Sequence, residues 1–163
     1  MSLRPIFDVF FLPQGEVKPL PKVGLGIKIV NIPFGVLMLD QNVGSIYSTI
    51  DNTAPILLKS IIPDFLLTGS ETTYLSGMPA HTMRFIGYIG EGVKAVQTTF
   101  LIHEGNLYVL TYFAPLQEFA TFLPDANSMT DSFDIVDANG SEALAEGTTQ
   151  LMLLDQNLVR LQP

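Results

Sequence analysis

Four apolar runs joined by short turns, between residues 71 and 114, constrain the fold of this chain most strongly. In the second run, Met83 and Phe85 alternate with Thr82 and Arg84, which is the period of a β-strand. The turns contain glycine, as β-hairpins require. Consecutive runs joined in this way predict an antiparallel meander with a core face. The predicted strands are Glu71–Leu75, Ala80–Ile89, Val93–Ile102 and Leu107–Ala114.

Two segments beside the meander switch to a helical period. Residues 51–65 predict a short helix, with Asn52 or Thr53 as its cap, Pro55 in its first turn and Pro63 at its end. Its apolar residues share one face at helical spacing and are Ile56, Leu57, Ile61 and Ile62. Residues 115–129 predict a second helix with a kink or restart at Pro124. Its apolar stripe consists of Leu116, Phe119, Leu123, Ala126 and Met129.

Further strands are predicted nearer the ends of the chain. Residues 24–33 alternate like a half-buried strand, and residues 34–39 and 43–50 could form a hairpin around the turn-prone residues 40–42. Residues 133–136 are expected to return to the sheet as an edge strand, and residues 151–161 to add a final hairpin. The fold class predicted is α+β, an antiparallel sheet flanked by helices.

The length of 163 residues predicts a single domain. Residues 1–22 are expected to be an N-terminal arm and linker, because three prolines fall between residues 13 and 21. Phe7, Phe10 and Phe11 exceed what a loose arm needs, so they are expected to dock on the sheet, or else to belong to an interface. Residues 137–163 are expected to be a C-terminal extension.

Composition excludes several classes of function. A net charge of −8 argues against a nucleic-acid partner, whose phosphates require clustered Lys and Arg. No apolar run approaches the roughly 18 residues of a membrane span. Cysteine is absent, which removes disulfides, thiolate metal sites and thiol nucleophiles. No apolar h-region follows a basic start, and the opening Met-Ser-Leu is expected to be an added leader, so the sequence leaves the compartment open.

The two histidines, His81 and His103, are weak candidates for chemistry. His81 is two and four residues before Met83 and Phe85, so its side chain is predicted on the same face of the strand, near the rim of the core face or just outside it. Glu71 could pair with it there. His103 lies beside Glu104 in a turn, where an exposed polar residue is expected. Two isolated histidines without cysteines make a poor zinc site. We therefore expect no catalytic, cofactor-binding or metal-binding residue here, and interpret His81 as structural.

Other motifs are partial or absent. Asp137, Asn139, Gly140 and Glu146 match positions of a calcium-binding loop, but its first position is Ile135 rather than a carboxylate. An Asn-Gly turn in an acidic loop is the simpler interpretation, and calcium binding stays open. No Gly-x-Ser-x-Gly elbow, dinucleotide-binding fingerprint or Walker loop occurs. The sequence contains no recognised catalytic signature.

Residues 71–136 resemble the PsbP-like family. The resemblance rests on LSGMPAHTMRF (residues 75–85), on VKAVQTTFLIHEGNLYVLTYFAP (residues 93–115) and on EFATFLPDANSMTDSFDI (residues 118–135). It implies an α/β/α sandwich around an antiparallel sheet. Residues 24–33 look like the family's first core strand, although Phe34-Gly35 replaces the usual aromatic. The stretch that follows looks shorter than usual, and nothing after Val136 is covered.

What the resemblance implies about function is a non-enzymatic module that binds or helps to assemble another protein, often outside the cytoplasm. Two alternatives remain open. One is a small-ligand or lipid carrier with a pocket of at least roughly 300 Å³ between helix and sheet. The other is a hydrolase using Asp or His, which needs two polar groups within hydrogen-bonding reach in one cleft. A homodimer through a sheet edge or the Phe-rich arm is also open.

Overall fold

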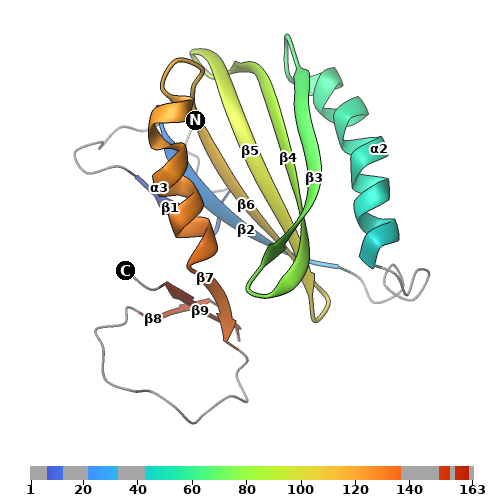
Figure 1. Cartoon of the computed structure of the whole chain (residues 1–163), viewed down its shortest axis with the longest axis vertical. Helices are drawn as coiled ribbons and strands as arrows, with labels where there is room; N and C mark the ends of the chain where they lie inside the picture. Colours follow the sequence, from blue (N-terminus) through green and yellow to red (C-terminus); the bar gives the residue numbers. More distant parts are fainter. Residues whose placement is uncertain (1–6, 13–21, 33–42, 137–150, 155–156, 162–163) are drawn as a thin grey trace.

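The structure is a computed structural model that describes residues 7–12, 22–32, 43–136, 151–154 and 157–161 (Figure 1). Its helices are α2 (Val43–Ile61) and α3 (Phe119–Asp131). Its strands are β1 (Val9–Phe11), β2 (Gly24–Asn31), β3 (Leu66–Leu75), β4 (Met78–Ile89), β5 (Gly92–His103), β6 (Asn106–Pro115), β7 (Phe133–Val136), β8 (Leu151–Leu154) and β9 (Asn157–Leu161).

A six-stranded antiparallel sheet in the order β1-β2-β6-β5-β4-β3 forms the centre of the molecule. Strands β3 to β6 are the predicted meander, each paired with the next along the chain. At the β3–β4 and β5–β6 turns, two consecutive residues have positive φ angles, Ser76 with Gly77 and Glu104 with Gly105. This is the pattern of type I′ turns, whose twist matches that of the flanking strands. The prediction of a meander is confirmed.

The two helices cover opposite faces of this sheet. Tyr112 and Ala114 of β6 pack against α3. Because neighbouring residues in a strand point to opposite faces, Phe113 points to the other face. There it packs in one cluster with Leu58 of α2. The helix–sheet–helix layering confirms the predicted α+β fold, and Figure 1 shows α2 and α3 on the two sides of the strands.

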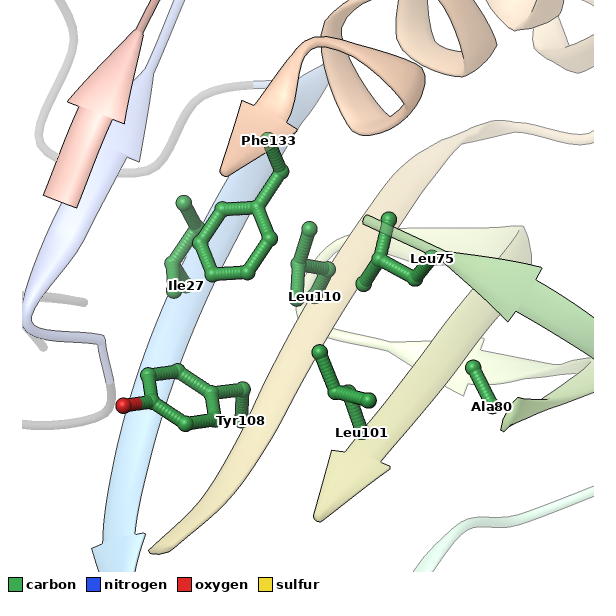
Figure 2. Packing of buried hydrophobic residues seen from close by; sticks show 7 residues of the cluster. All are labelled: Ile27, Leu75, Ala80, Leu101, Tyr108, Leu110 and Phe133. Carbon is green, nitrogen blue, oxygen red and sulfur yellow. The ribbon is translucent and has the colours of Figure 1, made fainter. Parts of the chain in front are cut away.

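The largest apolar cluster lies on the face that α3 covers. Tyr108 and Leu110 of β6 pack beside Ile27 of β2 and Leu101 of β5. Phe133 packs in the same cluster (Figure 2). Phe133 follows α3 directly, and its carbonyl oxygen accepts a hydrogen bond from the Ser76 hydroxyl in the β3–β4 turn. This contact ties the end of α3 to the meander.

Strand β1 docks on β2 through aromatic side chains that lie over glycines. A Cβ at Gly26 would overlap the ring of Phe7, and one at Gly24 would overlap the ring of Phe10. Phe7 and Phe10 stack at 5.5 Å, and Phe10 stacks on Phe113 at 5.8 Å. The docking predicted for the phenylalanines of the arm is therefore confirmed. The glycines of β2 provide the space for it.

The predicted start of helix α2 is wrong. The helix begins at Val43, so residues 43–50 are helical rather than half of a hairpin, and Pro55 lies inside the helix rather than in its first turn. The segment 33–42 lies outside the described residues.

The predicted apolar face of this segment is confirmed only for Ile62, which packs on the sheet just after the helix ends. Ile56, Leu57 and Ile61 are exposed. The helix itself contacts the sheet through Tyr47 and Leu58.

The last strands form a second, three-stranded sheet in the order β7-β9-β8. Residues 133–136 were expected at an edge of the main sheet, but β7 pairs with β9 over Phe133–Val136. Strands β8 and β9 pair antiparallel with each other. In α3, the predicted stripe is confirmed for Phe119, Leu123, Ala126 and Met129. Leu116 precedes the helix and is exposed.

Candidate functional site

His81 lies between the sheet and α2, where it is 3% exposed. It is therefore buried rather than at the rim of the core. Its ring stacks on Tyr47 of α2, with centroids 5.6 Å apart. The Tyr47 hydroxyl donates to the Pro79 carbonyl oxygen at 3.0 Å and accepts from the Ile102 N–H at 3.3 Å. Burial raises the pKa of Tyr47, and the hydrogen bond from Ile102 opposes this effect.

Asp51 and Ser70 complete a polar cluster around His81, which we call the His81 cluster. Nε2 of His81 lies 2.7 Å from Oδ1 of Asp51 and 2.8 Å from Oγ of Ser70. The Ser70 hydroxyl also donates to Oδ1 of Asp51. The predicted pairing of His81 with Glu71 is wrong, because Glu71 forms an ion pair with Arg84 at 2.8 Å.

The geometry of the His81 cluster differs from that of a nucleophilic triad. In a triad the carboxylate contacts one imidazole nitrogen and the serine the other. Here both partners contact Nε2, while Nδ1 is buried without a hydrogen-bond partner. Since an ionised carboxylate only accepts, Nε2 carries the hydrogen. It therefore cannot take a proton from Ser70, and the cluster links α2 to β3 and β4 rather than activating a nucleophile.

A second polar chain crosses the opposite face of the sheet. Glu71 pairs with Arg84, whose Nε donates to Oε1 of Gln97 at 2.8 Å. Nε2 of Gln97 then donates to Oδ1 of Asn127 in α3 at 2.9 Å. Gln97, the buried member, is hydrogen-bonded on both sides, as buried polar groups require. This chain joins three strands to α3, and its pairings leave no group poised for catalysis.

The other candidates from the sequence are His103 and the calcium-like loop. His103 ends β5 and is half-buried rather than fully exposed. Within the described part of the chain, no three His, Cys, Asp or Glu residues gather in a group that could hold a metal ion. Residues 137–146 of the calcium-like loop lie outside the described residues, so calcium binding stays a prediction.

Large apolar side chains are exposed in the second half of α2. Ile56, Leu57 and Ile61 are 71%, 59% and 72% exposed. We call these three residues the α2 surface. Leu57 and Ile61 are one helical turn apart, so they lie side by side. Lys59 is the only charged residue of the helix within this stretch.

Two pockets open on the ends of the sheet. The first has a volume of about 600 Å³ and lies on the side of Phe113, with Phe7, Phe85 and Val96 among its lining residues. The second, of about 310 Å³, lies between α3 and β2 and is lined by Leu25, Tyr112 and Met129 among others. The smaller pocket occupies the place that the carrier alternative predicts, but it includes the exposed Leu12 and is open rather than enclosed.

Sequence reasoning missed the His81 cluster and the α2 surface for different reasons. The partners of His81 are 30 and 11 residues away in the chain, so no local spacing indicates them. A partial signal for the α2 surface did exist. Tyr47, Asp51 and Leu58 follow helical spacing, and assigning them to the buried side would have placed Ile56 on the opposite side of the helix.

Comparisons by sequence find no relationship. No protein-family model matches the chain, and no curated protein matches it significantly. In addition, no helix within the described residues has the length and apolar character needed to cross a membrane.

Solved structures share the fold. A protein of unknown function from Pseudomonas aeruginosa matches with a TM-score of 0.53 at 12% identity, over 76% of this chain and 79% of that one. CyanoP, the PsbP protein of the cyanobacterium Synechocystis, matches at 0.48 and 12% identity, over 74% and 76%. LpqN, involved in cell envelope biogenesis in Mycobacterium tuberculosis, matches at 0.43 and 19% identity, over 67% and 60%.

These similarities concern the fold alone, because all three identities are low. The resemblance to a PsbP protein that the motifs of residues 71–136 predict is confirmed as a structural resemblance. Function has to be argued from the surfaces of this chain itself.

Proposed function

We propose that the chain is a non-enzymatic binding or assembly module that recognises another protein through the α2 surface. The observation that carries this proposal is the exposure of Ile56, Leu57 and Ile61 on a helix whose other side already packs on the sheet. A helix that is apolar on both sides normally has both sides covered. A partner protein would cover the apolar side chains of α2 that do not pack on the sheet.

The chemistry of the α2 surface suits a protein partner. Contiguous exposed apolar side chains mark interaction sites, whereas isolated ones carry no such meaning. Interfaces are also depleted of charge at their centres. Here Ile56, Leu57 and Ile61 share one stretch of helix with a single charge, Lys59, on a chain of net charge −8. The partner's matching face is expected to be apolar rather than basic.

The remaining features are compatible with this role. The His81 cluster has no serine-activating geometry, which supports a module without enzymatic activity. The sequence resemblance to the PsbP-like family supports a place outside the cytoplasm, and fractionation of the tagged protein in its source organism tests that point. We further propose that residues 1–163 form one domain, with residues 1–22 as an arm and 137–163 as an extension.

A capture experiment tests the proposal. The chain is immobilised and exposed to envelope and soluble extracts of its source organism, and retained proteins are identified by mass spectrometry. The double variant Leu57→Gln/Ile61→Gln makes the α2 surface polar with good helix formers. We expect one protein to be retained by the native chain and lost from the double variant.

Tyr74→Gln serves as the matched control, because Tyr74 is 71% exposed but lies near the end of β3, outside the α2 surface. It should retain the partner. Retention that is the same for the native chain and the double variant would contradict the proposal. Sedimentation of the native chain alone distinguishes a second copy as the partner, since a homodimer would dissociate in the double variant.

A further inference from the structure

The larger pocket has the construction of a small-molecule site, and we call it the Phe113 pocket. Its floor consists of Phe85, Val96 and Phe113, all less than 9% exposed, and Phe7 of the docked arm forms a wall. Its volume of about 600 Å³ falls within the range of about 300–1,000 Å³ that ligand pockets occupy. None of its lining residues belongs to α2, so it is separate from the α2 surface.

A lysine is positioned over the apolar floor. Nζ of Lys94 lies 4.8 Å from the centroid of the Phe113 ring and donates to the carbonyl oxygen of Lys22 at 3.0 Å. Lys22 and Lys94 both line the pocket. A ring face and a carbonyl thus hold an ammonium group at a defined point above the apolar floor of the pocket. Ligand sites combine apolar walls with a few such placed polar groups.

We propose that the Phe113 pocket binds a single-chain anionic amphiphile, with the hydrocarbon against Phe85 and Phe113 and the carboxylate facing Lys94. The aromatic floor provides apolar area that a hydrocarbon chain would remove from water. The ammonium of Lys94 provides charge complementarity for the head group.

Two carboxylates at the pocket affect where the anionic head group of the proposed ligand is expected to bind. Glu91 and Glu118 also line it, and both are exposed, whereas Lys94 is half-buried. Water and salt screen exposed charges more effectively than sheltered ones. The anion is therefore placed at Lys94, next to the Phe113 ring, rather than at the outer margin beside the two glutamates.

Binding of three ligands with the same chain length tests the assignment. Decanoate, decanol and decyltrimethylammonium are titrated as monomers into the full chain, with calorimetry for affinity and amide NMR shifts at Val96 and Phe113 for location. We expect decanoate to bind at least about tenfold more tightly than decanol, as one charge-assisted hydrogen bond provides. Stronger binding of the cation, or no binding of decanoate, would overturn the proposal.

Three variants identify the groups involved. Lys94→Met keeps the apolar stem and removes the charge, so decanoate should bind about as weakly as decanol. Lys59→Met removes the same charge outside the pocket and should bind like the native chain. Gly92→Leu fills the pocket, and a Cβ at Gly92 meets no atom within 4 Å, so this folded variant should lose both ligands. Unchanged decanoate binding in Lys94→Met would contradict the assignment.

A membrane source of an anionic head group is tested in a separate arm with phosphatidylglycerol vesicles. We expect no binding to vesicles, because a pocket of about 600 Å³ beside Phe7 and Phe113 accepts a single free chain. Binding to vesicles without binding of monomeric decanoate would contradict the small-molecule site and would indicate a membrane-binding surface instead. These outcomes are independent of the capture experiment, since Lys94 and Gly92 lie outside the α2 surface.

Discussion

At the scale of single residues, His81 is the side chain whose surroundings were hardest to foresee. Its Nε2 shares one hydrogen with Asp51 and Ser70, and its Nδ1 is buried without a hydrogen-bond partner. A buried nitrogen without a partner is unfavourable. The compensation lies in the stacking on Tyr47 and in the contact with Asp51, which together hold α2 on the sheet.

Removing the carboxylate should therefore destabilise the fold. We expect Asp51→Ala to lower the free energy of unfolding by about 1–3 kcal/mol, the typical effect of losing a hydrogen bond to a charged group. Urea denaturation measures the difference, and Glu91→Ala, at an exposed turn, is the matched control. If the two variants were equally stable, Asp51 would not hold α2 in place.

Tyr112 predicts how stability depends on alkaline pH. Burial, together with the carboxylates of Glu118 and Asp125, raises its pKa to about 12. Since this lies above the ordinary value of 10.0, its contribution is complete below pH 10 and is lost as pH rises through about 12. We expect the free energy of unfolding to fall over this interval, measured by urea denaturation.

The matched variant is Tyr112→Phe, which keeps the ring and loses the hydroxyl that donates to the Phe119 carbonyl oxygen. Its alkaline decline should be smaller, although not absent, because burial also raises the pKa of Tyr47. An equally steep decline in both proteins would show that Tyr112 is not the responsible group.

At the scale of elements, strand β1 depends on the glycines beneath it. A Cβ at Gly26 would overlap the Phe7 ring near its attachment to the backbone, so the side chain cannot simply swing aside. We expect Gly26→Ala to lower the free energy of unfolding by about 1–3 kcal/mol, as overpacking does. In the Phe7→Ala background the same change should have a much smaller effect. Additive effects would contradict the packing of Phe7 on Gly26.

Elements joined by local contacts could be predicted, and those that depend on distant contacts could not. The meander follows from alternation and from turns such as Ser76-Gly77, which are local. The first half of α2 is rich in β-branched and aromatic residues and so looks like a strand. In the structure this half is helical, and it contacts Pro79 and His81, which lie about 30 residues further along the chain.

The candidate sites show the same limit. Helical spacing indicated that Leu57 and Ile61 share a side, and this is observed, but spacing does not reveal which side the sheet covers. The Phe113 pocket combines Phe7, Phe85 and Lys94 from three separate parts of the chain. Their proximity depends on β1 docking beside β2, which the sequence indicated only through an excess of phenylalanines near the N-terminus.

At the scale of the whole molecule, the two faces of the sheet are closed to different degrees. On one face, Phe133 and α3 cover two apolar clusters (Figures 1 and 2). On the other, α2 covers the sheet but leaves its own outward side apolar. This asymmetry is the basis of the proposed function.

Site-specific photo-crosslinking in the source organism tests this claim most directly. The photoreactive residue p-benzoylphenylalanine replaces Leu57 in one variant and Tyr74 in the other, and crosslinked products are identified by mass spectrometry. We predict one dominant protein adduct from position 57 and none of comparable yield from position 74. No adduct at position 57, or the same adducts from both positions, would contradict recognition through the α2 surface.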